Sequence, residues 1–219
     1  MITHFTIYGE RNSGTKLLQK IISECFDLEL TWHFGFKHFF GHHNEMVRSA
    51  QEVLFLGIVR NPYNWINSMI NKPYHAPKQN RKSITDFLFN EWYSIQEAQD
   101  HRTIPVQEKE IMQDRYWIDN TRHNNIFEMR KRKLLFLAKD MHELNTNYYS
   151  IRYEDLCESP QKTLTDISDR FNIKQSRKTN TKIRVNKNKI QNKIINIVNE
   201  NIDWKNESLF NYERILIND

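Results

Sequence analysis

The chain has little of several features that would fix its class at once. Its 219 residues include only 2 cysteines, Cys25 and Cys157, too few for a disulfide framework or, by themselves, a zinc site. With 5 glycines and 5 prolines it is neither collagen-like nor rich in linkers. No apolar run reaches the roughly 18–20 residues of a membrane-spanning helix. The first ten residues lack the layout of a secretory signal, so we expect a cytoplasmic protein without a membrane span.

Aromatic and charged residues are plentiful by contrast. The 13 Phe, 9 Tyr and 5 Trp, in a sequence that is 38% hydrophobic, predict a packed core rather than disorder. The length suits a single domain over residues 1–219. The net charge of +5 favours an anionic ligand, which leaves nucleotides, nucleic acids, sulfated glycans and membrane surfaces open.

Short apolar runs alternate with helical patterns along most of the chain. The apolar run 53–59 is typical of a central parallel strand that is covered on both faces. The pattern predicts strands at 5–8, 28–32, 53–59 and 148–152, and helices at 17–26, 62–70, 84–99, 125–141, 160–171 and 190–199. This predicts an α/β fold, a three-layer α/β/α arrangement around a central parallel sheet. The irregular stretch 72–123 is interpreted as an insertion or lid on the acceptor side of a site.

The segment Gly9–Lys16 lies between the first predicted strand and its helix. Backbone N–H groups at the start of a helix, together with the helix dipole, bind anions. Gly14 allows the backbone to approach an anion closely. Hydroxyl groups come from Ser13 and Thr15, and positive charge comes from Arg11 and Lys16. We therefore expect a phosphate-binding loop, with an ordinary strand–helix turn as the alternative.

A kinase-type P-loop is the first interpretation to test. Its motif is G-x-x-x-x-G-K-[ST], and Gly9 and Gly14 have that separation. The next pair, Thr15-Lys16, has the reverse order, which displaces both the lysine and the hydroxyl that binds Mg²⁺. The apolar strand 53–59 is followed by Arg60 rather than ending in Asp. A P-loop kinase or nucleoside-triphosphate-binding protein is therefore kept as an alternative only.

Arg60 and Ser68 form a second candidate anion site. Arg60 follows the central strand, and Ser68 comes eight residues later. If Pro62 begins a helix, Ser68 lies about two turns into it. An arginine fork and a serine hydroxyl can together hold a phosphate.

Three segments in this order, 9–18, 59–68 and 152–171, resemble motifs of the sulfotransferases that use 3′-phosphoadenosine-5′-phosphosulfate (PAPS). The first resembles the family's 5′-phosphosulfate loop and the second its 3′-phosphate motif. The third, Arg152–Leu156 followed by Ser159-Pro160 and a helix, is similar to its late strand–helix segment.

The resemblance implies a P-loop nucleotide-kinase-like core and a PAPS-dependent sulfotransferase. A sulfuryl group would pass from PAPS to a hydroxyl or amine of a small-molecule or glycan acceptor, without a metal and without nucleic acid. By position, the resemblance assigns the 5′-phosphosulfate to Arg11, Asn12, Ser13, Gly14, Thr15 and Lys16, the 3′-phosphate to Arg60 and Ser68, and the adenine side to Tyr153.

The chain departs from the family pattern at two places. The family often has Lys or Arg where this chain has Asn12, so either Arg11 or Lys16 would contact the bridging oxygen. The glycine-rich basic motif that closes over the 3′-phosphate is missing. A basic stretch takes its place or is a solvated face: Lys182, Arg184, Lys187 and Lys189.

The histidine-rich segment 32–43 comes after the second predicted strand and contains the candidate bases. In one branch of the family a Lys–His pair lies there, and Lys37-His38 matches it. The resemblance therefore implies His38 as general base and Lys37 as its electrostatic partner, with His33 as the second candidate. A metal site and a structural histidine loop are the alternatives for this segment. For the whole chain, a non-catalytic nucleic-acid-binding protein is the rival from another class.

Overall fold

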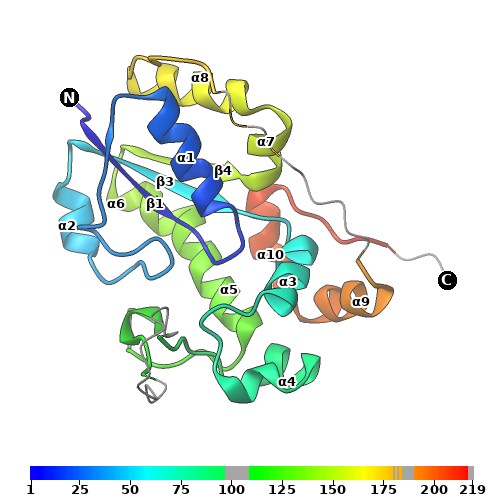
Figure 1. Cartoon of the computed structure of the whole chain (residues 1–219). Helices are drawn as coiled ribbons and strands as arrows, with labels where there is room; N and C mark the ends of the chain where they lie inside the picture. Colours follow the sequence, from blue (N-terminus) through cyan, green and yellow to red (C-terminus); the bar gives the residue numbers. More distant parts are fainter. Residues whose placement is uncertain (97–108, 180, 182, 184–189, 217–219) are drawn as a thin grey trace, which may run out of the picture.

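The computed structural model describes residues 1–96, 109–179, 181, 183 and 190–216 (Figure 1). The strands are β1 (His4–Tyr8), β2 (Glu29–Leu30), β3 (Val53–Val59) and β4 (Tyr148–Arg152). The helices are α1 (Thr15–Cys25), α2 (Asn44–Ser49), α3 (Pro62–Asn71), α4 (Ile84–Phe89), α5 (Ile126–Leu135), α6 (Met141–Leu144), α7 (Tyr153–Glu158), α8 (Pro160–Phe171), α9 (Asn192–Asn201) and α10 (Trp204–Glu207). None of the helices in these ranges is long and apolar enough to cross a membrane.

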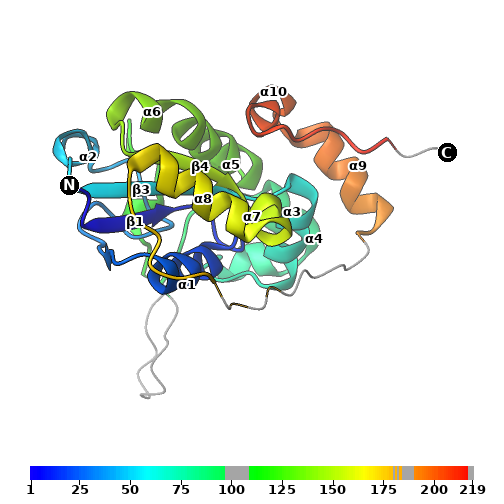
Figure 2. The ribbon, with the colours of Figure 1, turned by 90° about the horizontal axis from the view of Figure 1, so that it is seen from above.

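The strands form one parallel sheet in the order β2-β1-β3-β4, which confirms the predicted α/β class. Every residue of β3 is buried, as expected for a central strand that is covered on both faces. Seen from above in Figure 2, α1, α7 and α8 lie on one side of the sheet, and α5 and α6 lie on the other. The arrangement fits three layers, with the sheet in the middle.

The alternation of side chains along β3 divides the core between the two faces. Leu54, Leu56 and Ile58 belong to the cluster beneath α1, α7 and α8. Phe55 and Val59 belong to the cluster beneath α5 and α6. Since successive side chains of a strand point to opposite faces, one apolar run supplies both clusters.

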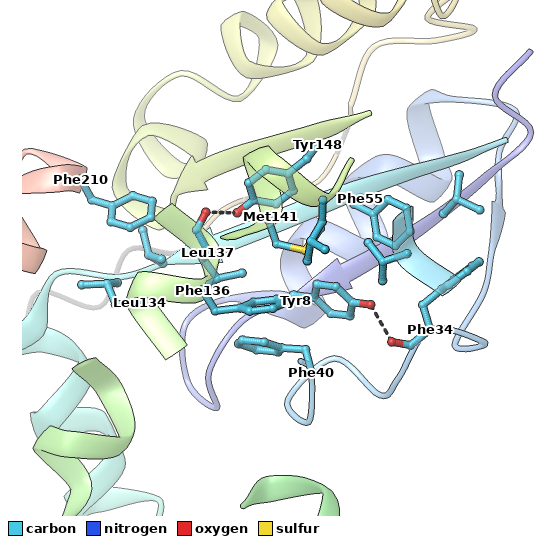
Figure 3. Packing of buried hydrophobic residues seen from close by; sticks show 14 of the residues in the cluster. Tyr8, Phe34, Phe40, Phe55, Leu134, Phe136, Leu137, Met141, Tyr148 and Phe210 are labelled. Atoms are coloured by element: carbon cyan, nitrogen blue, oxygen red, sulfur yellow. Dashed lines mark hydrogen bonds between the residues drawn. The ribbon is translucent and has the colours of Figure 1, made fainter. Parts of the chain in front are cut away.

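The cluster beneath α5 and α6 is rich in aromatic side chains (Figure 3). Two buried tyrosine hydroxyls in it donate to backbone carbonyls, Tyr8 to Phe34 at 2.6 Å and Tyr148 to Leu137 at 2.7 Å. Burial of a hydroxyl is costly without such a partner. The first of these bonds also fixes the segment after β2 against the end of β1.

Helix α3 begins where the sequence predicts. Pro62 takes the first helical position, and the Asn61 side chain accepts hydrogen bonds from the Tyr63 and Asn64 amides. A third apolar cluster, beside the sheet, packs α3 against α4, α5 and α9. The cap and this packing together hold the helix that carries Ser68.

The prediction of a helix over 84–99 is wrong beyond Phe89. Helix α4 stops there, and Trp92 exchanges backbone hydrogen bonds with His123, at 2.7 and 3.1 Å. The Trp92 side chain is fully buried, so tertiary packing outweighs the local helical pattern. Residues 97–99 of that prediction lie outside the described ranges. Helix α7, which begins at Tyr153 directly after β4, was not predicted.

Gly57 on β3 packs closely against the Tyr148 side chain of β4, and this contact can be tested by mutation. A Cβ there would meet the Tyr148 hydroxyl and would lie 2.9 Å from its Cζ. We expect Gly57→Ala to lower the free energy of unfolding by about 1–3 kcal/mol, as overpacking does, measured by urea denaturation. The control is Ser150→Ala at the paired position on β4, expected to change it by less than about 0.5 kcal/mol. A Gly57→Ala protein as stable as the control would contradict this packing.

Candidate functional site

The segment after β2 is fastened to the first residue of the candidate phosphate loop. The Gly9 amide donates to the Lys37 carbonyl at 2.9 Å, and His38 Nδ1 bonds to the Gly9 carbonyl at 2.7 Å. The structure therefore places Lys37 and His38 beside the loop. The parallel sheet makes it possible, because the carboxyl ends of neighbouring strands meet at one edge.

The loop itself turns through two residues with left-handed backbone. Asn12 has φ of 62° and Gly14 has φ of 99°. At Gly14 no other residue fits, since a Cβ there would collide with the Tyr153 ring. Between them Ser13 donates its hydroxyl to the Glu10 carbonyl at 2.5 Å and its amide to the same oxygen at 3.2 Å. The Ser13 side chain is thus used to close the turn.

The loop leads directly into α1 without a side-chain cap. The Leu18 amide is the first to bond back within the helix, to the Gly14 carbonyl at 3.0 Å. The amides of residues 14–17 have no intrahelical acceptor, as in the first turn of any helix. They lie at the start of an 11-residue helix whose first turn carries no acidic side chain, an arrangement that favours an anion.

Arg60 joins this loop to α3. Its Nη1 donates to the Asn12 carbonyl and to the Ser68 hydroxyl, both at 2.9 Å. The Tyr153 ring centroid lies 4.8 Å from the guanidinium carbon, and Nε is buried without a partner among the described residues. The Asn12 side-chain Nδ2 donates to the Lys72 carbonyl at 3.2 Å. The two candidate anion sites of the sequence therefore meet at one place.

A polar cavity of about 270 Å³ opens where they meet. Its lining comes from the loop, from the end of β3, from one side of α3 with its C-cap, and from the start of α7. The lining residues are, in this order, Asn12; Arg60; Asn64, Asn67, Ser68, Asn71 and Lys72; and Tyr153. This lining has two cations and four side-chain amides, and none of these eight residues is acidic. Such a lining favours an anion.

Arg11 is placed differently from its loop neighbours. Its side chain is 3% exposed and its Nη2 contacts Asp114 at 2.7 Å and the Ser94 hydroxyl. Asp114 also pairs with Lys133 on α5. Burial alone would raise the pKa of Asp114, but Lys133 and Arg11 outweigh it and lower that pKa to about 2.

Lys16 is exposed and lies near Lys37, at a hollow of about 530 Å³ along α1. Of the two cations considered for the bridging oxygen, Arg11 is engaged by Asp114 while Lys16 has no carboxylate partner in the described ranges. Lys37 is 7% exposed, and burial together with Lys16 lowers its pKa. The geometry therefore favours Lys16 and Lys37 as the cations available to an anion.

The hydrogen bond to Gly9 assigns the tautomer of His38. A carbonyl only accepts, so Nδ1 carries the proton and Nε2 carries the free lone pair. Burial, and then Arg11, lower the pKa of His38 well below its usual value. The imidazole is therefore neutral at pH 7 and can accept a proton at Nε2. His33, the second candidate, is exposed, with its ring edge-on to Phe34.

Sequence reasoning missed the buried charges behind the loop. Arg130 donates to Glu207, to Glu10 at 3.0 Å and to the Arg60 carbonyl at 2.9 Å. The basic residues of 125–133 suggest from the sequence either a solvated helix face or the lining of an acceptor pocket, but Arg130 and Lys133 are 1% and 3% exposed. Arg130 lies three residues after buried Phe127, and Lys133 lies four residues after buried Met129. This spacing was the available signal, because positions three and four apart share a helix face.

The metal alternative for the histidine segment and the basic stretch near the C-terminus are the two remaining features considered from the sequence. In the described part of the chain, the histidines of 33–43 do not gather with Cys, Asp or Glu into a group of three that could hold a metal. The basic stretch of Lys182, Arg184, Lys187 and Lys189 lies outside the residues that the structure describes.

Comparison with known proteins found no family model that matches the chain and no curated protein that matches it. The function therefore has to be inferred from the site.

The lowered pKa of His38 predicts how stability depends on pH. Below its usual pKa of about 6.5 the unfolded chain binds a proton that the folded His38 does not, so acid lowers the free energy of unfolding. One such group contributes at most about 1.4 kcal/mol per pH unit. We expect His38→Gln to make the decline between pH 7 and pH 5 shallower, measured by urea denaturation. The free energy of unfolding of each protein is compared with its own value at pH 8. Equal declines in the variant and the wild type would contradict the lowered pKa of His38.

Proposed function

We propose that the protein is a PAPS-dependent sulfotransferase with a P-loop nucleotide-kinase-like core. The observation that carries the proposal is Arg60 Nη1, which donates both to the loop carbonyl of Asn12 and to the Ser68 hydroxyl beside a cavity without acidic lining. The two segments that resemble the family's phosphate motifs thus lie side by side.

The residues present fit such a donor. Arg60 keeps a buried Nε without a partner among the described residues, and with Ser68 and the neighbouring asparagines it would hold the 3′-phosphate. The loop amides and Lys16 would hold the 5′-phosphosulfate, and Tyr153, whose ring lies beside Gly14, would face the adenine. When bound, PAPS supplies an activated sulfuryl group.

The chain's own contribution to the reaction is charge, orientation and a base. Lys16 and Lys37 stabilise negative charge that develops on the leaving phosphate. His38 Nε2 would accept the proton of the acceptor hydroxyl or amine as that group takes up the sulfuryl group and adenosine 3′,5′-bisphosphate leaves with the bridging oxygen. The bond from Nδ1 to Gly9 holds the ring against the same loop that holds the donor. The acceptor is a small molecule or a glycan.

The donor site is tested by thermal melting with adenosine 3′,5′-bisphosphate. Because a ligand that binds the folded state raises Tm, we expect a shift without magnesium. Arg60→Ala should weaken binding at least tenfold, since hydrogen bonds to charged groups contribute about 1.5–3 kcal/mol. Arg152→Ala, at the end of the next strand, is the matched control and should bind normally. A shift with ATP and magnesium alone would favour the kinase alternative, and salt-sensitive binding of any oligonucleotide would favour the nucleic-acid-binding one.

The base is tested separately. With an acceptor found by screening, we expect His38→Gln to lower turnover by about 10²–10⁴-fold, the usual contribution of a general base. The affinity for adenosine 3′,5′-bisphosphate should change less than threefold, because His38 does not line the Arg60 cavity. His33→Gln is the control. If that control loses turnover and His38→Gln keeps it, the roles of the two histidines are reversed.

A further inference from the structure

Asp114 is the centre of a buried charge network that none of the assigned roles uses. It is 1% exposed and lies in the stretch interpreted as an insertion. One oxygen contacts Arg11 at 2.7 Å and the Ser94 hydroxyl, and the other contacts Lys133. Its backbone carbonyl accepts from His123 Nε2 at 3.1 Å. The carboxylate therefore binds two cations from two different parts of the fold.

Each of these cations leads to a different part of the candidate site. Arg11 belongs to the phosphate loop, and its backbone carbonyl accepts from the Trp65 indole on α3 at 3.0 Å. Lys133 donates a second hydrogen bond, to the His38 carbonyl, at 2.9 Å. The same histidine bonds to Gly9 at the start of the loop. Asp114 thus contacts the loop directly, through Arg11, and is linked to the candidate base through Lys133.

We propose that Asp114 is a positioning residue, which holds the phosphate loop through Arg11 and the His38 segment through Lys133. This inference rests on the proposed function for its kinetic consequence, although its structural consequence does not. It gives the insertion a role beyond shaping the acceptor side: its residues Ser94 and Asp114 complete the support of the loop.

A single carboxylate pairs with both cations, so its loss leaves both buried without their ion-pair partner, and Glu10, which also attracts them, is paired with Arg130. Arg11 and Lys133 would then move toward water, and the loop and the His38 carbonyl would lose their supports. Removal of Lys133 alone would free only the second support, because Asp114 would still pair with Arg11. The two variants therefore have different predicted patterns, which general destabilisation does not produce.

The structural half is tested by hydrogen–deuterium exchange with mass spectrometry. In Asp114→Asn we expect faster exchange in peptides over 9–18 and 33–40, and in Lys133→Met over 33–40 only. A peptide over α8, on the opposite face of the sheet, should keep its wild-type rate in both. The matched control is Glu110→Gln, which removes a carboxylate of the same segment that binds Arg115 and Arg122 instead of the loop. The proposal would be overturned if the peptides over 9–18 and 33–40 exchanged at the wild-type rate in Asp114→Asn. It would also be overturned if Glu110→Gln accelerated their exchange equally.

The kinetic half separates positioning from a merely structural role. We expect kcat to fall about tenfold or more in Asp114→Asn and in Lys133→Met, while the Kd for adenosine 3′,5′-bisphosphate in Lys133→Met stays within threefold. If Asp114→Asn does not fold, Lys133→Met decides alone. A loss of binding in Lys133→Met equal to its loss of kcat would overturn the positioning role. If the wild type binds no bisphosphate, the proposed function fails while the exchange data still decide the role of Asp114.

Discussion

The parallel pairing of β1 with β3 is the constraint on which the candidate site depends. Tyr8 is paired with Gly57, so the chain leaves both strands at the same edge of the sheet. Gly9 and Arg60 then stand close enough for Arg60 to reach the Asn12 carbonyl. A shift of this register by one residue would turn every side chain of β3 to the other face. The two apolar clusters therefore fix the register, and through it the position of the arginine.

Much of the fold and part of the site can be predicted from the sequence. The apolar run 53–59 and the Asn61-Pro62 cap are local signals, and the structure keeps both. The meeting of Arg60 with Ser68 is also predictable, since it needs only a strand end and two helical turns. Asp114 could not have been foreseen, because its partners Arg11 and Lys133 are brought to it only by tertiary packing. The failure of the predicted helix beyond Phe89 has the same cause.

The buried ion pairs specify geometry more than they supply stability. Desolvation of the Arg130, Glu10 and Glu207 side chains offsets much of their attraction, as in other buried ion pairs. Burial raises the pKa of Glu10 to about 7 in spite of the adjacent Arg130. What the network does achieve is position: one guanidinium contacts the loop, the Arg60 carbonyl and α10 together. Each contact is directional, and a hydrophobic substitute would not reproduce it.

The remaining cations differ from these in a way that bears on function. Arg11, Arg130 and Lys133 are each paired with a carboxylate, whereas Arg60, Lys16 and Lys37 have none among the described residues. Burial and the charge of Lys16 lower the pKa of Lys37, so its charged form is held at a cost. An anion beside it would remove that cost, and the same anion would meet unbonded amides at the start of α1. The paired cations therefore hold the loop and helices in place, and under the proposed function the unpaired cations would bind the negative groups of the donor.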